Sequence, residues 1–236
     1  MKRIFIHIPK NAGSALKLKL RDIGVVAINP RNANKCMKPG YKIGLERTFT
    51  GNNQSGMKPN YTHCRWVDLS DEMKKLQAFA IIRNPWDRVV SRYLFREVLR
   101  NEKKIVGYKT FEQFLEERHI DGGKKYFWHR AVQGWYDQRD YVSHDGVLKC
   151  DILRYEHLNK DVRRYLNLSE SFTLIWKNVS NGLKNADRTA VSGRQDYRTF
   201  YNETTKQIVA DWYANDIDFF GFTFDGPATR NIWSKG

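Results

Sequence analysis

The 236-residue sequence has only three cysteines, no long apolar run and no GxxxxGK[ST] phosphate-binding loop. The cysteines (Cys36, Cys64 and Cys150) are odd in number and form no CxxC pair, which argues against a disulfide framework or a cysteine-rich zinc site. We therefore expect a reducing, cytoplasmic environment. No stretch approaches the roughly 18 consecutive apolar residues of a membrane-spanning helix. The apolar run at residues 4–8 is too short for a secretory signal and is expected to form a buried strand.

Basic residues, in contrast, are abundant. Lys and Arg number 41 against 26 Asp and Glu, which gives a formal net charge of +15. A chain with this excess of positive charge is expected to bind anions, such as nucleic acids, phosphate-bearing cofactors, acidic glycans or anionic membranes. Charge alone does not choose among them. Hydrophobic residues make up 41% of the chain and aromatic residues 14%, which excludes a wholly disordered protein.

Apolar segments with strand character recur along the chain. The segment at 78–83 is nearly all apolar, as in a strand buried on both faces of a parallel sheet. Strands are expected at residues 3–8, 24–28, 78–83 and 150–154. Residues 29–61 are rich in Pro, Gly, Asn and Lys and are expected to form a long loop, with a short strand at 42–49.

Amphipathic segments follow most of these strands. Helices are expected at residues 14–22, 85–100, 110–119, 156–166 and 202–215. In the first of them, Leu alternates with Lys and Arg as in a strand, but the good helix formers favour a helix. The alternation of strands and helices predicts an α/β fold with three αβα layers around a mainly parallel sheet, in a single domain over residues 1–236. Ligands of such folds bind at the carboxyl ends of the strands.

Two loops at these strand ends carry groups suited to phosphate. In residues 9–16, small residues let backbone N–H groups approach an anion, the following helix adds its positive dipole end, and Lys10 and Ser14 add a charge and a hydroxyl. In the second loop, Arg83 ends the most buried strand and Ser91 lies two turns into the next helix. An Arg can bind a phosphate with two hydrogen bonds.

Each loop also has a structural interpretation. The first loop is equally typical of an ordinary strand-to-helix turn with a solvated Lys. In the second, Arg83 and Arg88 are candidates for ion pairs with Asp87 or Glu97. We favour that interpretation for Arg88 and the phosphate-binding interpretation for Arg83.

The patterns PKxxGS after the first strand and RxPxxRxxSxY after a later one resemble the PAPS-dependent sulfotransferases. The closest branch is the carbohydrate sulfotransferases of the heparan sulfate 2-O and HNK-1 type. Residues 152–158 (ILRYEHL) resemble the strand of that family that ends in RYEDL, and residues 201–224 resemble its final helix and ending. The four landmarks occur in order over most of the chain. The resemblance implies a P-loop-like sulfotransferase fold.

The resemblance also implies a reaction. A sulfuryl group would pass from PAPS (3′-phosphoadenosine 5′-phosphosulfate) to a hydroxyl of an acceptor, leaving PAP, with no metal. Lys10 would contact the 5′-phosphate and the oxygen that bridges it to sulfur. Arg83 and Ser91 would bind the 3′-phosphate. The remaining 5′-phosphate contacts would come from Asn11, Ala12, Gly13, Ser14 and Ala15. Ala15 stands where the family usually has Ser or Thr, so one hydroxyl contact is lost.

Other roles implied by the resemblance concern the base, a covering loop and the acceptor. His63 is expected to be the general base, with His7 as a rival and a structural histidine as the alternative. A loop before the last helix is expected to cover the cofactor with Arg188 or Arg194, unless it is only solvated. The acceptor is expected to be a saccharide. It could be anionic if basic side chains line its approach (Arg65, Lys103, Lys104, Lys124 and Lys125), although such a charge run is usually a solvated face.

Two other functions stay open at this stage. A P-loop-like nucleotide kinase would share the fold, but no Walker A loop is present and the main strand ends in Arg83 rather than Asp. A basic nucleic-acid-binding protein would fit the charge, but no homeodomain, zinc-finger or RNA-recognition signature supports it. We expect neither a nucleic-acid partner nor a membrane span.

Overall fold

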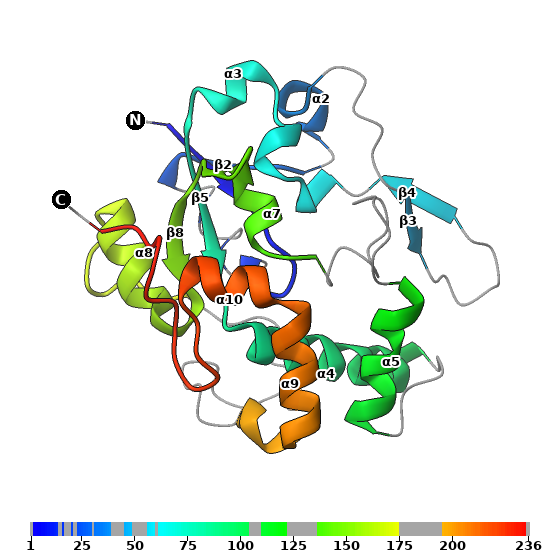
Figure 1. The fold of residues 1–236 in the computed structure, drawn as a ribbon. Helices are drawn as coiled ribbons and strands as arrows, with labels where there is room; N and C mark the ends of the chain where they lie inside the picture. The colour runs from blue at the N-terminus through cyan, green and yellow to red at the C-terminus, as the bar shows by residue number, and fades with distance from the viewer. Residues whose placement is uncertain are drawn as a thin grey trace.

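A four-stranded parallel sheet lies at the centre of the computed structural model (Figure 1). Its strands are β1 (Arg3–Ile6), β2 (Val25–Ala27), β5 (Gln77–Ile82) and β8 (Asp151–Arg154), in the order β2-β1-β5-β8. This confirms the predicted strands and their parallel arrangement. The structure describes residues 2–13, 16, 20, 23–29, 31–38, 45–48, 56–59, 61–103, 110–121, 136–174 and 195–234.

Two apolar cores, one on each face of the sheet, follow from the alternation of side chains along the strands. Phe5 and Phe79 belong to one core, with the apolar side of α8 (Leu158–Leu166) and with Leu16 and Leu20. Ile6 and Ala80 belong to the other, with α4 (Pro85–Lys103), α7 (Arg139–Val142), α9 (Glu203–Trp212) and α10 (Ala214–Phe220). Helices therefore cover both faces, as the predicted three layers require (Figure 1).

The helices expected at 85–100, 110–119 and 156–166 are confirmed, with shifted ends. Leu16 and Leu20 are helical and buried one turn apart, which favours the helix over the alternating strand; the residues between them are outside the described part. The helix expected at 156–166 begins at Leu158, after the 3-10 turn η4 (Tyr155–His157). The single helix expected at 202–215 is wrong, because α9 ends at Trp212 and α10 begins at Ala214.

Smaller elements fill the connections. The loop expected at 29–61 is wrong in part, because it contains the short helix α2 (Ala33–Cys36) and the hairpin of β3 (Leu45–Thr48) and β4 (Gly56–Pro59). β3 confirms the short strand expected there. The other elements are η2 (Tyr61–His63), η3 (Trp66–Asp68), α3 (Asp71–Lys74), α5 (Phe111–Asp121), β6 (Ser143–His144), β7 (Val147–Leu148) and η5 (Tyr197–Phe200).

The C-terminal segment after α10 is tied to the strand ends. The Asn84 side chain, just beyond β5, donates to the carbonyls of Thr223 and Gly226, both at 2.9 Å. Farther along, the Trp233 N–H donates to the Ile152 carbonyl at 2.9 Å. These bonds hold the segment near the edge where β5 and β8 end. None of the described helices is long and apolar enough to cross a membrane.

Candidate functional site

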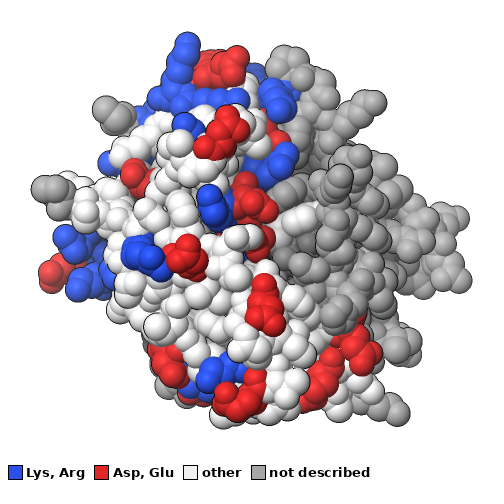
Figure 2. Space-filling model, in the orientation of Figure 1, with Lys and Arg blue, Asp and Glu red and all other residues white. Residues whose placement is uncertain are grey.

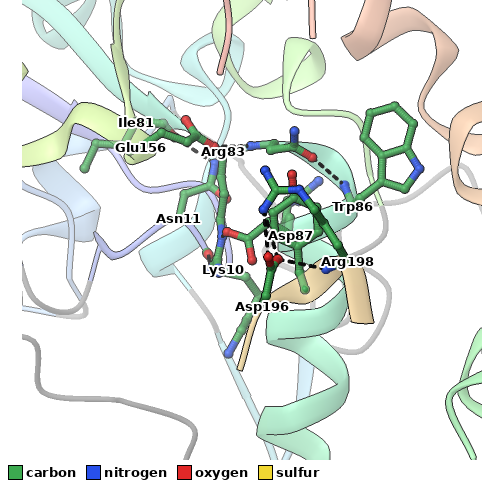
Figure 3. Close-up of polar contacts among 12 residues, drawn as sticks. Lys10, Asn11, Ile81, Arg83, Trp86, Asp87, Glu156, Asp196 and Arg198 are labelled. Atoms are coloured by element: carbon green, nitrogen blue, oxygen red, sulfur yellow. Dashed lines mark hydrogen bonds and ion pairs between the residues drawn. The ribbon is translucent and has the colours of Figure 1, made fainter. Parts of the chain in front are cut away.

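Three connections meet at the carboxyl edge of the sheet, because parallel strands all end on the same side. They are residues 7–13 after β1, residues 83–84 after β5, and residues 155–156 after β8. Figure 3 shows side chains from all three around Arg83. This edge is where parallel α/β folds place their ligands.

The first loop has an unusual backbone. Lys10 and Ala12 have φ values of 70° and 60°, in the left-handed region that non-glycine residues seldom adopt. Two buried arginines fix the carbonyls of this turn: Arg88 Nε donates to Pro9 O at 3.2 Å, and Arg83 Nη1 donates to Lys10 O at 2.8 Å. Left-handed residues that alternate with right-handed ones direct successive N–H groups to one side, which is a recurrent form of anion-binding turn. The positive φ values at Lys10 and Ala12 make this loop a candidate for such a turn.

Arg83 is only 3% exposed and has several partners. Its Nε donates to Asp87 Oδ2 at 2.7 Å (Figure 3). Its guanidinium carbon lies 4.1 Å from the centre of the Tyr155 ring. Burial disfavours the charged guanidinium, but Asp87, Tyr155 and Glu156 together outweigh burial and raise the pKa of Arg83. Arg83 thus makes the structural ion pair with Asp87 that we did not favour for it, and its binding of a phosphate stays a prediction.

Arg88 is also buried, with 1% exposure. It binds main-chain carbonyls, those of Pro9 and Tyr136, and its Cζ lies 5.8 Å from the Tyr213 ring centre. Arg88 was expected to pair with Asp87 or Glu97: the pair with Asp87 is wrong, because Asp87 Oδ2 accepts from Arg83, and the Glu97 side chain lies outside the described residues. Arg88 instead holds the start of the first loop against the core.

Gln138, at the start of α7, joins the two loops and was not identified from the sequence. Its Oε1 accepts from Asn11 Nδ2 at 2.6 Å and from Arg83 N at 2.9 Å, while its Nε2 donates to Arg83 O at 2.9 Å. No local pattern indicated this role, because Gln138 stands in a segment without helix or strand periodicity.

Asp216 of α10 anchors Gln138 and is fully buried. Its Oδ2 accepts from the Gln138 N–H and its Oδ1 from the Arg139 N–H, both at 2.8 Å. Burial, and then the nearby charge of Asp137, raise the pKa of Asp216 to about 7. In the sequence, Asp216 lies within residues 201–224, which resemble the final helix and ending of the family, but no role was predicted for this residue.

The third connection supports the second loop. Glu156 Oε1 accepts from the Asn84 N–H at 2.7 Å. Burial raises the pKa of Glu156, although the bond from Asn84 opposes this. Ser91 is 8% exposed in α4, and no hydrogen bond joins it to Arg83 within the described structure.

Two histidines lie beside the first loop. The ring centres of His7 and His63 are 4.5 Å apart at an interplanar angle of 65°. A Cβ on Gly13 would lie 1.9 Å from Cδ2 and 2.0 Å from Nε2 of His7. Gly13 is therefore required by the His7 ring, a reason that differs from the predicted close approach to an anion. The same contacts bring His63 next to the loop that contains Lys10.

The remaining predicted residues have mixed outcomes. Ser14, Ala15, Arg188 and Arg194 lie outside the described residues, as do the side chains of Lys103, Lys104, Lys124 and Lys125. Arg65, expected near the acceptor, forms two hydrogen bonds with the buried carboxylate of Asp68. The sequence missed Arg198 of η5, which is 40% exposed and pairs with Asp196 and Asp225 (Figure 3).

The face of the molecule drawn in Figure 2 carries mixed charge: Lys and Arg lie among Asp and Glu, with no continuous basic tract across the described part of that face. Within the described residues, no group of three or more His, Cys, Asp or Glu side chains could hold a metal ion. The arrangement at the sheet edge is thus one of backbone N–H groups, arginines and imidazoles.

A model of the Sulfotransferase family matches residues 2–223. Because the match spans almost the whole chain, this protein belongs to the sulfotransferase family. Its α/β architecture around a mainly parallel sheet is the one predicted from the sequence.

One solved structure with similarity to the chain is the crystal structure of a sulfotransferase from Alicyclobacillus acidocaldarius, at 18% identity and a TM-score of 0.32. The similarity covers 63% of this chain and 54% of the other, so the chain spans about half of that protein's length. A comparison with curated proteins finds no match.

The contact between His7 and Gly13 can be tested by substitution. Gly13→Ala should lower the free energy of unfolding by about 1–3 kcal/mol, because the added methyl group collides with the imidazole. Urea unfolding measures the change. In a His7→Ala background the same substitution should cost clearly less. An equal cost in both backgrounds would show that the His7 ring is not what excludes a side chain at this position.

The titration of Asp216 predicts a pH dependence of stability. Its folded pKa of about 7 lies above the unfolded value near 3.9. The folded chain therefore keeps a proton that the unfolded chain has lost, so the stabilisation is complete below pH ~4 and disappears as the pH rises through about 7. Between pH 5.5 and 7.5 this group should remove about 2 kcal/mol from the free energy of unfolding.

Asp216→Asn should make the free energy of unfolding less dependent on pH over this range, because an amide does not ionise. Urea unfolding at several pH values measures the change. Asp218→Asn is the matched control, since the Asp218 side chain is 87% exposed on the same helix. It should keep the wild-type profile. Identical profiles for wild type and Asp216→Asn would contradict this assignment.

Proposed function

We propose that this sulfotransferase transfers the sulfuryl group of PAPS to a hydroxyl of a saccharide acceptor. The observation that carries the proposal is the 2.8 Å hydrogen bond from Arg83 Nη1 to the carbonyl of Lys10. It joins the candidate 3′-phosphate residue to the candidate 5′-phosphate loop at one edge of the sheet. A bisphosphorylated nucleotide needs two anion sites held at a fixed separation, and this contact supplies that constraint.

The groups present fit such a ligand. The turn at Lys10 and Ala12 offers a backbone concavity for the 5′-phosphate. In the described structure Arg83 uses its Nε hydrogen and one Nη1 hydrogen, so the second Nη1 hydrogen and both Nη2 hydrogens would serve the 3′-phosphate. Ser91 would add a hydroxyl from α4. The ion pair between Arg83 and Asp87 holds the guanidinium in place before the ligand binds.

Chemistry at this site needs positioning, charge stabilisation and one proton transfer. PAPS supplies the sulfuryl group, whose bond to the 5′-phosphate oxygen breaks as a bond to the acceptor oxygen forms. His63 accepts the proton of the acceptor hydroxyl. Lys10 neutralises the charge that develops on the 5′-phosphate oxygen. His7, edge-on to His63, keeps the base next to the loop.

The acceptor and the compartment belong to the proposal as well. A saccharide acceptor is supported by the resemblance of both phosphate-loop motifs to the carbohydrate branch of the family. The mixed charge of the described surface gives no separate support to an anionic acceptor, because Arg65 is paired with Asp68. Cytoplasmic location is supported by Cys36, Cys64 and Cys150, which are all buried and none of which forms a disulfide within the described structure.

Calorimetric titration with PAP, run beside ADP, tests the nucleotide site. PAP should bind about tenfold or more tightly than ADP, because a charged hydrogen bond to the 3′-phosphate contributes about 1.5–3 kcal/mol. Arg83→Ala should abolish the difference. Arg163→Ala, which removes an equal charge from α8, should keep it. Equal or absent binding of PAP and ADP would contradict the proposal, and the kinase or nucleic-acid alternatives would replace it.

The base is tested by turnover with PAPS and a panel of saccharides. His63→Ala should lower kcat about 100-fold or more, since general base catalysis contributes about 10²–10⁴. PAP affinity should stay within about twofold, because the imidazole touches the acceptor rather than the phosphates. His157→Ala, an exposed histidine of η4, is the control and should keep full activity. Unchanged kcat in His63→Ala would assign the base elsewhere.

A further inference from the structure

The amide of Gln138 is completely used inside the protein. The residue is 0% exposed. Its oxygen accepts from Asn11 and from the Arg83 N–H, and its nitrogen donates to the Arg83 carbonyl and to Asp216 Oδ2, the last at 3.2 Å. A primary amide has two donor hydrogens and two acceptor lone pairs, so all four are engaged. An amide this constrained has one orientation.

Gln138 meets Arg83 where the ladder of the sheet ends. Arg83 is the residue after β5, whose last registered pair with β8 is Ile82 with Arg154. Beyond that pair the main-chain N–H and C=O of Arg83 both bond to the Gln138 side chain. The glutamine supplies the two bonds that a neighbouring strand would supply. It therefore fixes the peptide from which the Arg83 guanidinium projects.

The same amide holds the first loop through Asn11. Asn11 is 1% exposed, and its Nδ2 donates both to Gln138 Oε1 and to Ile81 O, the latter at 2.7 Å. Asn11 lies between Lys10 and Ala12, the two residues with positive φ. The glutamine thus bonds within the turn that presents backbone N–H groups. A shift of either loop would leave buried donors or acceptors of the other unsatisfied, at about 1–3 kcal/mol for each group.

Asp216 holds Gln138 in place from the side opposite the two loops. Its carboxylate accepts from the Gln138 main-chain N–H and side chain, so both ends of the glutamine are fixed to α10. The two loops are therefore connected through one side chain that is itself immobilised.

We propose that Gln138 is a positioning residue that couples the two phosphate-binding loops, so that the 3′- and 5′-phosphates of PAP bind cooperatively. The inference rests on the proposed function, because it needs both anion sites. Because one amide bonds to both loops, the loops shift together: a phosphate that draws one loop into its bound position moves the other with it, so the second phosphate meets a loop that is already in place.

Four ligands measure this coupling: PAP, 5′-AMP, 3′-AMP and adenosine, each titrated by calorimetry. The coupling factor is the product of the Kd values of the two monophosphates, divided by the product of the Kd values of PAP and adenosine. The wild type should give a factor of about ten or more, within the usual range for linked sites. Gln138→Met, which keeps the length of the side chain and removes its hydrogen bonds, should bring the factor close to one.

Gln77→Met is the matched control. Gln77 stands at the opposite end of β5, where its side chain donates to Asp151 at 2.9 Å, away from both loops. The same substitution there should leave the factor at the wild-type value. Asn11→Ala is a second variant, which removes the bond between Gln138 and the first loop together with the bond from Asn11 to Ile81 O, and it should also reduce the factor. It keeps the test decisive if Gln138→Met does not fold.

The outcomes are distinct. Equal weakening of all four ligands by Gln138→Met, with the factor unchanged, would make the residue merely structural and overturn the inference. A wild-type factor near one would also overturn it. A wild type that binds PAP no better than adenosine would overturn the proposed function and this inference with it. PAP binding with an unchanged factor in Gln138→Met overturns the inference alone.

Hydrogen exchange of the ligand-free protein provides a readout that needs no nucleotide. In Gln138→Met, the amides of residues 11–13 and those of residues 83–84 should all exchange about tenfold or more faster than in Gln77→Met. Both loops must respond together, because one amide holds both. Faster exchange in only one of the two loops would overturn the inference that Gln138 holds both.

Discussion

The structure depends on how the arginine after β5 is held against the turn after β1. Arg83 is buried and donates to the Lys10 carbonyl and to Asp87 from the same guanidinium, while its own main chain is bonded to Gln138. These contacts fix the Lys10 carbonyl and the main chain of Arg83, so the turn after β1 and the end of β5 are held against each other around a buried cation.

Buried polar groups at this edge are stabilised by one another. Burying a charge costs several kcal/mol unless partners compensate for it. Arg83 is compensated by Asp87, and Arg88 by main-chain carbonyls. Asp216 accepts three N–H bonds, yet its pKa is raised to about 7 by burial. Such a network constrains geometry more than it adds stability, and it keeps the loops after β1 and β5 in a fixed relative position.

The sequence predicted the frame of the site but not its connections. An apolar run that ends in Arg83 locates a buried strand and a cation at its carboxyl end, and both are local signals. The role of Gln138 could not be predicted from local sequence, because its partners Asn11 and Arg83 lie 127 and 55 residues away along the chain. The break between α9 and α10 was missed because no Pro or Gly marks it: Tyr213 stands between Trp212 and Ala214. Gly13 was predicted to be small so that an anion can approach the backbone, whereas in the structure the His7 ring leaves no room for a side chain at this position.

A crystal structure of the protein with PAP tests the central claim most directly. The account predicts the 5′-phosphate within about 3 Å of backbone nitrogens in residues 10–13 and the 3′-phosphate at a similar distance from the Arg83 guanidinium. Gln138 should keep its four hydrogen bonds. PAP bound at another edge of the sheet, or with its 3′-phosphate away from Arg83, would contradict the account.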